Sequence, residues 1–321
     1  MRFLALCVLV FYAVSVEAAV TVRNENLITR DEISRVIPPL TGRVPSSQSH
    51  ALIKLGNRLF TDTRLSGSQD VACSSCHRLE QGGSDGRRYA RPQYHVNTPS
   101  IFNLRFYDRY YWNGRVSTLE AQADNAISNP VEMASDWSRV VNLVRTDPIY
   151  NALFAAAFQD GSIGKEQVIR ALVAYERSLV VVDSRFDRYL SGDLQALSDD
   201  EVKGARLFMD YGCVACHQGV NIGTNLYQKL GVVVPYVDSD GGRDGFDRFV
   251  VTGREEDIQR VRVPSLRNIA LTAPYLHDGS VAKLTDVVTI MFRHQLGWEP
   301  APTDLSLIVK FLMTLTGKTG L

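Results

Sequence analysis

Two short stretches of this 321-residue chain carry residues that could hold a redox cofactor. They read Cys73-Ser74-Ser75-Cys76-His77 and Cys213-Val214-Ala215-Cys216-His217. Each has the form C-x-x-C-H, in which two thiols can form thioether bonds to one haem and the His can ligate its iron. A lone C-x-x-C would also suit a structural zinc site or a redox dithiol. Two complete copies favour two covalently bound c-type haems.

The composition is that of an ordinary globular protein. The formal net charge is zero, charged residues make up 22% of the chain and hydrophobic residues 45%. With no basic block, we expect no nucleic-acid partner. The length is enough for two domains of ordinary size.

Residues 1–19 have the pattern of a secretory signal peptide. Arg2 precedes an apolar run from Phe3 to Val16, and small residues follow at Ala18 and Ala19. The run is short for a bilayer span, so we expect cleavage, no membrane span in the mature chain and a periplasmic location. Cleavage would also remove Cys7. The remaining four cysteines all lie in the haem motifs, so no disulfide is expected.

Helices must position the two motifs. The stretches Lys54–Phe60 and Lys203–Phe208 share a Leu-Phe pair and each precedes a C-x-x-C-H motif, which indicates an internal repeat. Helical periodicity predicts further helices at 119–127, 135–144, 165–179, 283–292 and 303–315. Long loops are expected at 79–97 and 231–253, and Pro235 argues against a central strand at 232–234.

The helical pattern predicts an all-α protein with two domains. It breaks at Ser191-Gly192-Asp193, which we take as a boundary between domains at 20–192 and 193–321. Each would be a cytochrome c-like haem domain, with long loops packed around its c-type haem. One domain with two haems in a shared core has no support in the sequence.

The sixth iron ligands decide the chemistry, because only a haem with one open face can bind an oxidant. Met291 lies late in the second domain, where it could complete His/Met ligation of the haem on His217; a Met on an apolar helix face can equally be core filler. The first domain offers Met133 and His95. Beside Met133, Glu132 could act as a general acid–base, although a lone Glu is usually a solvated surface charge.

Seven segments, which follow one another along the chain in the family's order, resemble those of the bacterial dihaem cytochrome c peroxidases and their relatives of the MauG type. They are the two C-x-x-C-H motifs together with Asn97–Asn103, Tyr111–Arg115, Asn129–Met133, Val263–Asn268 and Thr272–Gly279, the last leading on to Met291. The match covers most of the mature chain.

The resemblance implies a division of labour between the haems. The haem on His77 would be the low-potential peroxidatic centre, with Glu132 as the catalytic carboxylate. The haem on His217 and Met291 would be the high-potential centre that receives electrons, and Trp112 would help electrons cross between them. MauG-type relatives have a Tyr where this chain has Met291. His277 matches a His near the second haem.

The resemblance also implies a Ca²⁺ site and raises a question about the first haem. Asn97 and the backbone carbonyls of Thr272 and Pro274 match the calcium ligands at the domain interface. Classical members have a distal His that caps the peroxidatic haem until the other haem is reduced; near that place this chain has Tyr89. Either His95 is a displaced cap or the first haem is open at rest, and we favour the open haem.

The function that follows is a periplasmic peroxidase that reduces H₂O₂ to water. A small cytochrome c or a cupredoxin would supply the electrons one at a time, and by analogy a homodimer is possible. One alternative is a MauG-like enzyme that oxidises Tyr or Trp of a partner protein. The other is a dihaem electron-transfer protein without catalytic chemistry, which requires both irons to be six-coordinate.

Overall fold

The computed structural model describes residues 28–41, 49–91, 95–237 and 246–319. The predicted signal peptide at 1–19 lies outside these residues. In the parts of the chain that the structure describes, none of the helices is both long and apolar enough to cross a membrane.

The protein is mostly helical, as the sequence predicts. The α-helices are α1 (Arg30–Val36), α2 (His50–Phe60), α3 (Cys73–Cys76), α4 (Leu119–Ser128), α5 (Trp137–Thr146), α6 (Pro148–Ala157), α7 (Lys165–Ser178), α8 (Arg185–Leu190), α9 (Asp199–Asp210), α10 (Phe249–Thr252), α11 (Leu284–Ile290) and α12 (Pro302–Met313). Four short strands form two antiparallel pairs: β1 (Val181–Val182) with β4 (Lys318–Thr319), and β2 (Tyr227–Lys229) with β3 (Arg260–Arg262).

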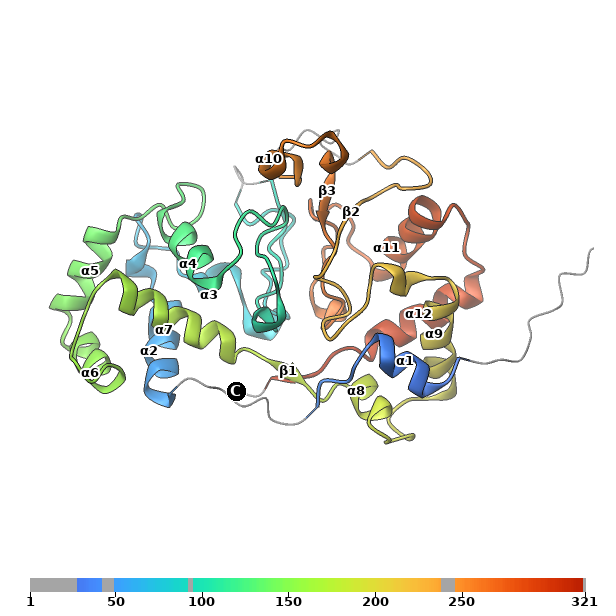
Figure 1. The fold of residues 1–321 in the computed structure, drawn as a ribbon, viewed down its shortest axis with the longest axis horizontal. Coiled ribbons are helices and arrows are strands. Elements are labelled where there is room, and N and C mark those ends of the chain that lie inside the picture. The colour runs from blue at the N-terminus through green and yellow to red at the C-terminus, as the bar shows by residue number, and fades with distance from the viewer. Residues whose placement is uncertain (1–27, 42–48, 92–94, 238–245, 320–321) are drawn as a thin grey trace, which may run out of the picture.

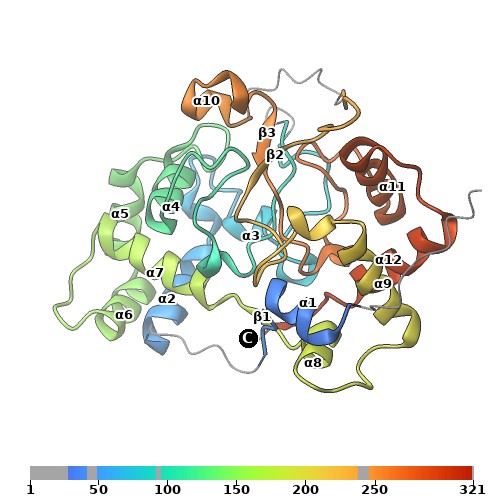
Figure 2. The same ribbon diagram turned by 45° about the vertical axis from the view of Figure 1, so that its right-hand side comes forward.

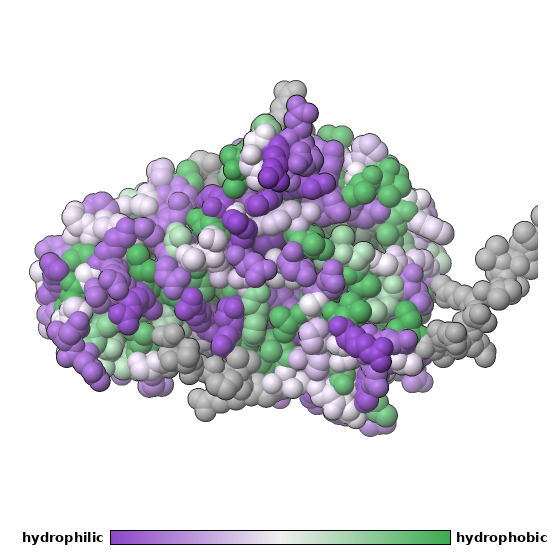
Figure 3. Space-filling view, viewed as in Figure 1, coloured by the Kyte–Doolittle hydropathy of each residue, from purple (hydrophilic) through white to green (hydrophobic). Residues whose placement is uncertain are grey.

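The helices form two groups that flank a central region of loops (Figures 1 and 2). Helices α2 and α4 to α7 lie on one side, and α1, α8, α9, α11 and α12 on the other. Each group has its own large hydrophobic cluster. On the face seen in Figure 3, hydrophobic and hydrophilic residues are mixed over both halves, as expected for a globular surface.

The packing changes from one cluster to the other near β1. Phe186 and Leu190 of α8 belong to the second cluster, as do Ile33 and Ile37 from the beginning of the described chain. This division precedes the predicted boundary at Ser191-Gly192-Asp193, and it assigns the α1 segment to the second group. A break in helical periodicity marks only a turn. The core to which a helix belongs depends on the side chains against which it packs.

The two groups are built on the same helix pairing. Helix α2 packs against α7, and α9 against α12. At the α2–α7 contact a Cβ on Gly56 would lie 2.0 Å from the carbonyl oxygen of Ala171, and at the α9–α12 contact a Cβ on Gly204 would lie 2.0 Å from that of Leu307. In the sequence, Gly56 and Gly204 occupy equivalent places, four residues before Phe60 and Phe208. The repeat is therefore also a repeat of close helix packing.

Several predicted helix ends shift by a few residues. The helix expected at 135–144 begins at Trp137, because the side chain of Asp136 caps it by accepting a bond from the backbone N–H of Arg139. The one expected at 283–292 is α11, which continues without a break into a π-helix at Met291–Leu296. The helix expected at 303–315 begins at Pro302, a residue favoured in the first turn, and ends at Met313.

A buried ion pair lies within the second group, and one of its members also binds the backbone of the segment before α2. The guanidinium of Arg267 donates to both carboxylate oxygens of Asp187 in α8, at 2.8 and 3.0 Å, and both side chains are at most 2% exposed. Asp187 also accepts a bond from the backbone N–H of Leu40. Removing one member of such a pair would leave the other charge buried without a partner.

Candidate functional site

The two C-x-x-C-H motifs adopt the same local geometry. The backbone N–H of His77 donates to the carbonyl of Cys73 at 2.9 Å, and that of His217 to the carbonyl of Cys213 at 2.9 Å. Each motif thus forms one tight turn that directs its two cysteines and its His together. Each turn follows the helix of the repeat: the second comes almost directly after α9, whereas residues 61–72, which include a short 3₁₀-helix at Thr63–Leu65, separate the first from α2.

Both histidines are oriented as metal ligands are. The Nδ1 of His77 lies 3.1 Å from the carbonyl oxygen of Gly83, and the Nδ1 of His217 lies 3.4 Å from that of Ile222. A bond from Nδ1–H to a carbonyl leaves Nε2 to face a metal. Burial lowers the pKa of His77, and it lowers the pKa of His217 to about 4. Both imidazoles are therefore neutral, which is the form that binds iron.

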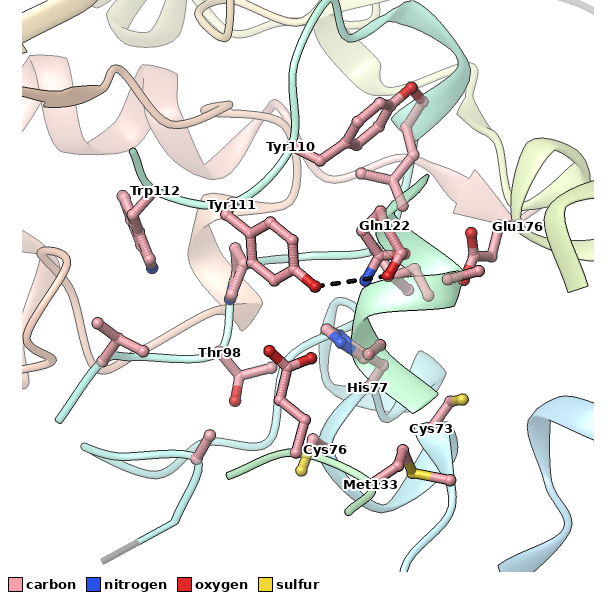
Figure 4. Close-up of a pocket in the computed structure, with 18 of the residues that line it drawn as sticks. Cys73, Cys76, His77, Thr98, Tyr110, Tyr111, Trp112, Gln122, Met133 and Glu176 are labelled. Atoms are coloured by element: carbon pink, nitrogen blue, oxygen red, sulfur yellow. Dashed lines mark hydrogen bonds between the residues drawn. The ribbon is translucent and has the colours of Figure 1, made fainter. Parts of the chain in front are cut away.

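The His77 motif opens into a pocket (Figure 4). Its empty space, including the open mouth, is about 1310 Å³. Cys73 and Trp112 lie on opposite sides of it, with His77 between them (Figure 4). Apolar and aromatic side chains of the first helix group form much of its lining, among them Phe60 of α2, Ile127 of α4 and Leu172 of α7.

The polar lining of this pocket fits a large cofactor that brings its own polar groups. Four side chains around it each have a buried atom without a hydrogen-bond partner among the described residues: Arg91 (Nη2), Thr98 (Oγ1), Glu176 (Oε2) and Arg262 (Nη1). Buried polar groups are normally paired, so such a set in one pocket indicates a ligand. A haem, with an apolar macrocycle and two carboxylates, matches this mixture.

Glu132 lies in the same pocket and is held by two neighbours. Its Oε1 accepts a bond of 2.7 Å from the side-chain amide of Asn129 and lies 3.4 Å from a guanidinium nitrogen of Arg115. Burial raises the pKa of Glu132 above its ordinary value, and Arg115, Asn129 and Tyr111 oppose that rise. The Glu132 side chain is 19% exposed. A partly buried carboxyl group with a raised pKa is better suited to general acid–base chemistry than a solvated surface charge.

Tyr111 and Arg115 fix this corner of the pocket. The guanidinium of Arg115 lies 3.3 Å from the centre of the Tyr111 ring and donates to the amide oxygen of Asn125 at 3.2 Å. The Tyr111 hydroxyl donates to the same amide oxygen at 3.0 Å and lies near the carbonyl of Gln122 (Figure 4). The position of Glu132 is thus tied to α4 through several bonds.

Trp112 lies where segments of the two halves meet. Its indole N–H donates to the carbonyl of Asn97 at 2.9 Å, and its ring is 6.3 Å from that of His277, centre to centre, in an edge-on contact. Its own carbonyl accepts a bond of 2.7 Å from the backbone N–H of Arg262 in β3. Trp112 therefore contacts the first pocket and the second half of the chain at once.

Met291 is placed differently from the residues on either side of it. Ile290 and Phe292 pack into the second hydrophobic cluster, whereas Met291 is only partly buried and is not among the side chains of that cluster. It is the first residue of the π-helix, an irregularity that often occurs at functional sites. These observations favour a ligand over core filler.

The structure does not bring His95 into the pocket around His77. His95 is exposed, and its ring stacks on Tyr89 at 4.8 Å between centres. Among the described residues, neither of these two side chains lines the pocket, although the neighbouring Val96 does. Met133 lines the pocket but is 4% exposed and packs in the first hydrophobic cluster.

The residues expected to bind calcium come from the contact between the loop at 81–97 and the segment at 272–279. Asn97 forms hydrogen bonds with both: its side-chain amide donates to the carbonyl of Arg87, and its backbone N–H donates to the carbonyl of His277. A Cβ on Gly82 would meet the Thr272 side chain at 2.8 Å, and one on Gly86 would lie 3.3 Å from Oε1 of Gln81 and 4.0 Å from the carbonyl oxygen of Ala273. That amide oxygen of Gln81 is buried and has no described partner. Uncharged oxygen atoms without donors suit Ca²⁺.

Three pocket residues were not singled out by the sequence. Arg115 is part of the Tyr111–Arg115 segment but has no assigned role, Glu176 lies on the predicted helix at 165–179, and Arg262 immediately precedes the Val263–Asn268 segment. Their roles depend on burial and on partners distant in the chain, which spacing does not reveal. For Glu176 there was one signal: a Glu on the apolar face of a predicted helix.

The comparisons with known proteins agree with this geometry. Residues 50–195 match the family model described as di-haem cytochrome c peroxidase. The chain is 39% identical over 287 residues to the cytochrome c551 peroxidase of Nitrosomonas europaea, which covers 88% of this chain and 84% of that protein. It is 38% identical over 301 residues to the cytochrome c551 peroxidase of Pseudomonas aeruginosa, covering 90% and 86%.

A solved structure shows the same fold. It is that of a MauG-like protein associated with microbial copper homeostasis, with a TM-score of 0.75 and 31% identity over 88% of this chain and 94% of that one. The class is thus that of the di-haem proteins with two C-x-x-C-H motifs. This chain belongs to the di-haem cytochrome c peroxidase family.

Proposed function

We propose that this protein is a dihaem cytochrome c peroxidase that reduces H₂O₂ to water. Family membership supports the class of reaction. The observation that carries the proposal to this chain is the partly buried carboxyl of Glu132, in the same pocket as His77 and held by Arg115 and Asn129. Cys73 and Cys76 would hold one haem c, and Cys213 and Cys216 the other.

Cys73, Cys76 and His77 would hold the first haem, which would supply the iron chemistry that breaks the O–O bond of peroxide. Glu132 takes a proton from one peroxide oxygen and returns it to the leaving oxygen. Its raised pKa brings it closer to working pH, where proton exchange in both directions is fast. Arg115 keeps the ionised form of Glu132 accessible, because a nearby positive charge favours the carboxylate.

His217 and Met291 would hold the second haem, which would supply the electron-accepting centre. A thioether ligand raises the reduction potential, which suits an electron-accepting centre. Trp112 lies on the route between the halves. We infer an exported protein in the periplasm, with residues 1–19 removed, Ca²⁺ at Asn97, Thr272 and Pro274, and a small cytochrome c or cupredoxin as donor. The possible homodimer rests on analogy alone.

The test is the variant Glu132→Gln, which keeps the shape of the side chain and removes its proton exchange. We expect both haem spectra to be unchanged and peroxide turnover with a reduced cytochrome c to fall about 10²–10⁴-fold. The matched control is Glu120→Gln, which alters an exposed Glu on α4 that does not line the pocket. A turnover of Glu132→Gln equal to that of the control would refute the assignment.

The likeness to a MauG-like structure favours one second candidate, the oxidation of Tyr or Trp in a partner protein. The two functions differ in what is consumed. A peroxidase oxidises reduced cytochrome in proportion to the peroxide added, whereas a MauG-like enzyme leaves the cytochrome reduced and modifies the partner. Electron paramagnetic resonance of the half-reduced protein excludes the simple electron-transfer protein if it shows a high-spin ferric haem.

A further inference from the structure

Arg262 is a buried cation whose binding partner is missing among the described residues. The residue is 3% exposed, and its Nη1 has no hydrogen-bond partner there. Nor does any described carboxylate form an ion pair with it; the charged residue that pairs in β3 is Arg260, with Asp257. A guanidinium taken out of water without an anion costs several kcal/mol. The position therefore calls for an anionic group.

The backbone and the rest of the side chain hold this guanidinium firmly in place. Arg262 is the last residue of β3 and pairs with Tyr227 of β2. Its Nε donates to the carbonyl of Tyr111 at 3.2 Å, and its guanidinium lies 4.7 Å from the centre of the Tyr107 ring. These contacts fix the plane of the guanidinium and use its Nε, so that Nη1 is left for a ligand.

The free nitrogen belongs to the pocket of His77, although Arg262 comes from the second half of the chain. Its bonds to the carbonyls of Tyr111 and Trp112 place it at the Trp112 side of that pocket. Cys73, which would bond to a vinyl group, lies on the opposite side (Figure 4). In a haem the two propionates project from the edge opposite the vinyl groups. The carboxylates of a haem bonded to this motif would thus point towards Arg262.

We propose that Arg262 binds a propionate of the haem on His77, so that the second half of the chain completes the first haem site. The inference rests on the proposed dihaem function. A guanidinium–carboxylate bond is the strong, directional pairing that this geometry permits. Arg91, whose Nη2 is also buried and unpartnered in this pocket, is available for the second propionate.

The proposal makes Arg262 a positioning residue with two attachments. One end of it contacts the haem carboxylate, and its Nε and backbone N–H hold the carbonyls of Tyr111 and Trp112. Its positive charge near the first haem favours the ferrous state, since ferrous haem carries one positive charge less. Removing that charge should lower the reduction potential of the first haem and leave that of the second nearly unchanged.

The experiment is a potentiometric titration of the holoprotein at several pH values, with Arg262→Gln, Arg262→Lys and a control. The control is Arg248→Gln: Arg248 also lies between the halves, over the Tyr227 ring at 4.1 Å and bonded to the carbonyl of Asn113, but it does not line the pocket. We expect Arg262→Gln to shift the first haem to lower potential and to make that potential depend on pH, because the released propionate then titrates. Arg262→Lys keeps the charge and should shift the potential less.

Several outcomes would overturn the proposal. One is a shift in Arg262→Gln no larger than that in Arg248→Gln, and another is an equal shift of both haems, which reports a general disturbance. If Arg262→Gln does not fold, the pH dependence of Arg262→Lys decides. A point charge holds the propionate less tightly than the guanidinium fork, so the first-haem potential of Arg262→Lys should depend more on pH than the wild type's, and an unchanged pH dependence would overturn the proposal. A free anion at Arg262 would instead make the wild-type potential depend on phosphate concentration at constant ionic strength. The proposed function fails separately, if the wild-type holoprotein does not turn over peroxide.

Discussion

Replacing Glu176 with glutamine should change how the stability of this protein depends on pH. Glu176 lies in α7, is 6% exposed, and has one carboxylate oxygen without a described partner. Its pKa is raised from 4.5 to about 8, chiefly by burial; the nearby Glu120 adds to the rise and Arg177 opposes it. Tyr110 and Cys73, whose own pKa values it affects, also face it. Near neutral pH the folded protein therefore holds this carboxyl protonated.

The sign of the effect follows from comparing the folded and unfolded chains. Below pH 4.5 both bind the proton, so the group has no effect on the free energy of unfolding. Between pH 4.5 and about 8 only the unfolded chain loses the proton, so the folded protein becomes less stable as the pH rises. At about 1.4 kcal/mol per pKa unit, the full loss has an upper limit of about 5 kcal/mol. Glutamine stays neutral in both states and removes this loss.

The assay is chemical denaturation of the haem-loaded protein at intervals from pH 5 to 8.5. The Glu176→Gln variant should gain stability relative to the wild type steadily across that range. Glu166→Gln on the same helix is the control, because that side chain is 77% exposed and pairs only weakly with Arg170. Stability curves of Glu176→Gln and wild type that run parallel from pH 5 to 8.5 would show that Glu176 is ionised in the folded protein, and the reasoning would fail.

Two further predictions concern the packing of the two halves. Alanine at Gly56 or Gly204 should destabilise by about 1–3 kcal/mol, because its Cβ would press on the carbonyl of Ala171 or Leu307, although Gly→Ala inside a helix normally stabilises by about 1 kcal/mol. Thermal unfolding measures this loss of stability. The control is Asn57→Ala, at an exposed neighbouring position, which should change stability by less than about 0.5 kcal/mol. Arg267→Gln should cost about 3–5 kcal/mol by leaving Asp187 buried and unpaired, whereas Arg188→Gln, from an exposed pair with Asp193, should cost less than about 1 kcal/mol. Equal losses in Arg267→Gln and Arg188→Gln would contradict the burial argument.

Much of the fold is legible in the sequence because helices have local signals. The helix expected at 119–127 is α4 to within one residue, and Ser198, followed by three acidic residues, is a local N-cap signal for the beginning of α9. The α2–α7 and α9–α12 pairings could not be predicted, since they depend on which faces meet. The packing division near β1 was also hidden, because Phe186 and Leu190 look the same in a sequence whichever core they join.

The candidate site divides in the same way. The spacing C-x-x-C-H is itself the signal for haem attachment, so the sequence alone predicts Cys73, Cys76 and His77 as haem-binding residues. The position of Glu132 in the pocket required the resemblance to a family, because one Glu in a loop carries no local signal. Arg115 and Arg262 required the structure: each is defined by a partner that the chain reaches only after folding.

The interface between the halves explains why the first pocket cannot be understood from the first half alone. Three hydrogen bonds from the other half hold the segment that contains Trp112. The backbone N–H of Arg262 donates to the carbonyl of Trp112, and its Nε donates to the carbonyl of Tyr111. The guanidinium of Arg248 donates to the carbonyl of Asn113. The backbone bond between Asn97 and His277 joins the halves on the other side of the indole. Because the neighbours of Trp112 come from both halves, a small movement of one half against the other displaces this segment. Two of the three bonds come from Arg262, which also lines the first pocket, so such a movement would reach the pocket through that side chain.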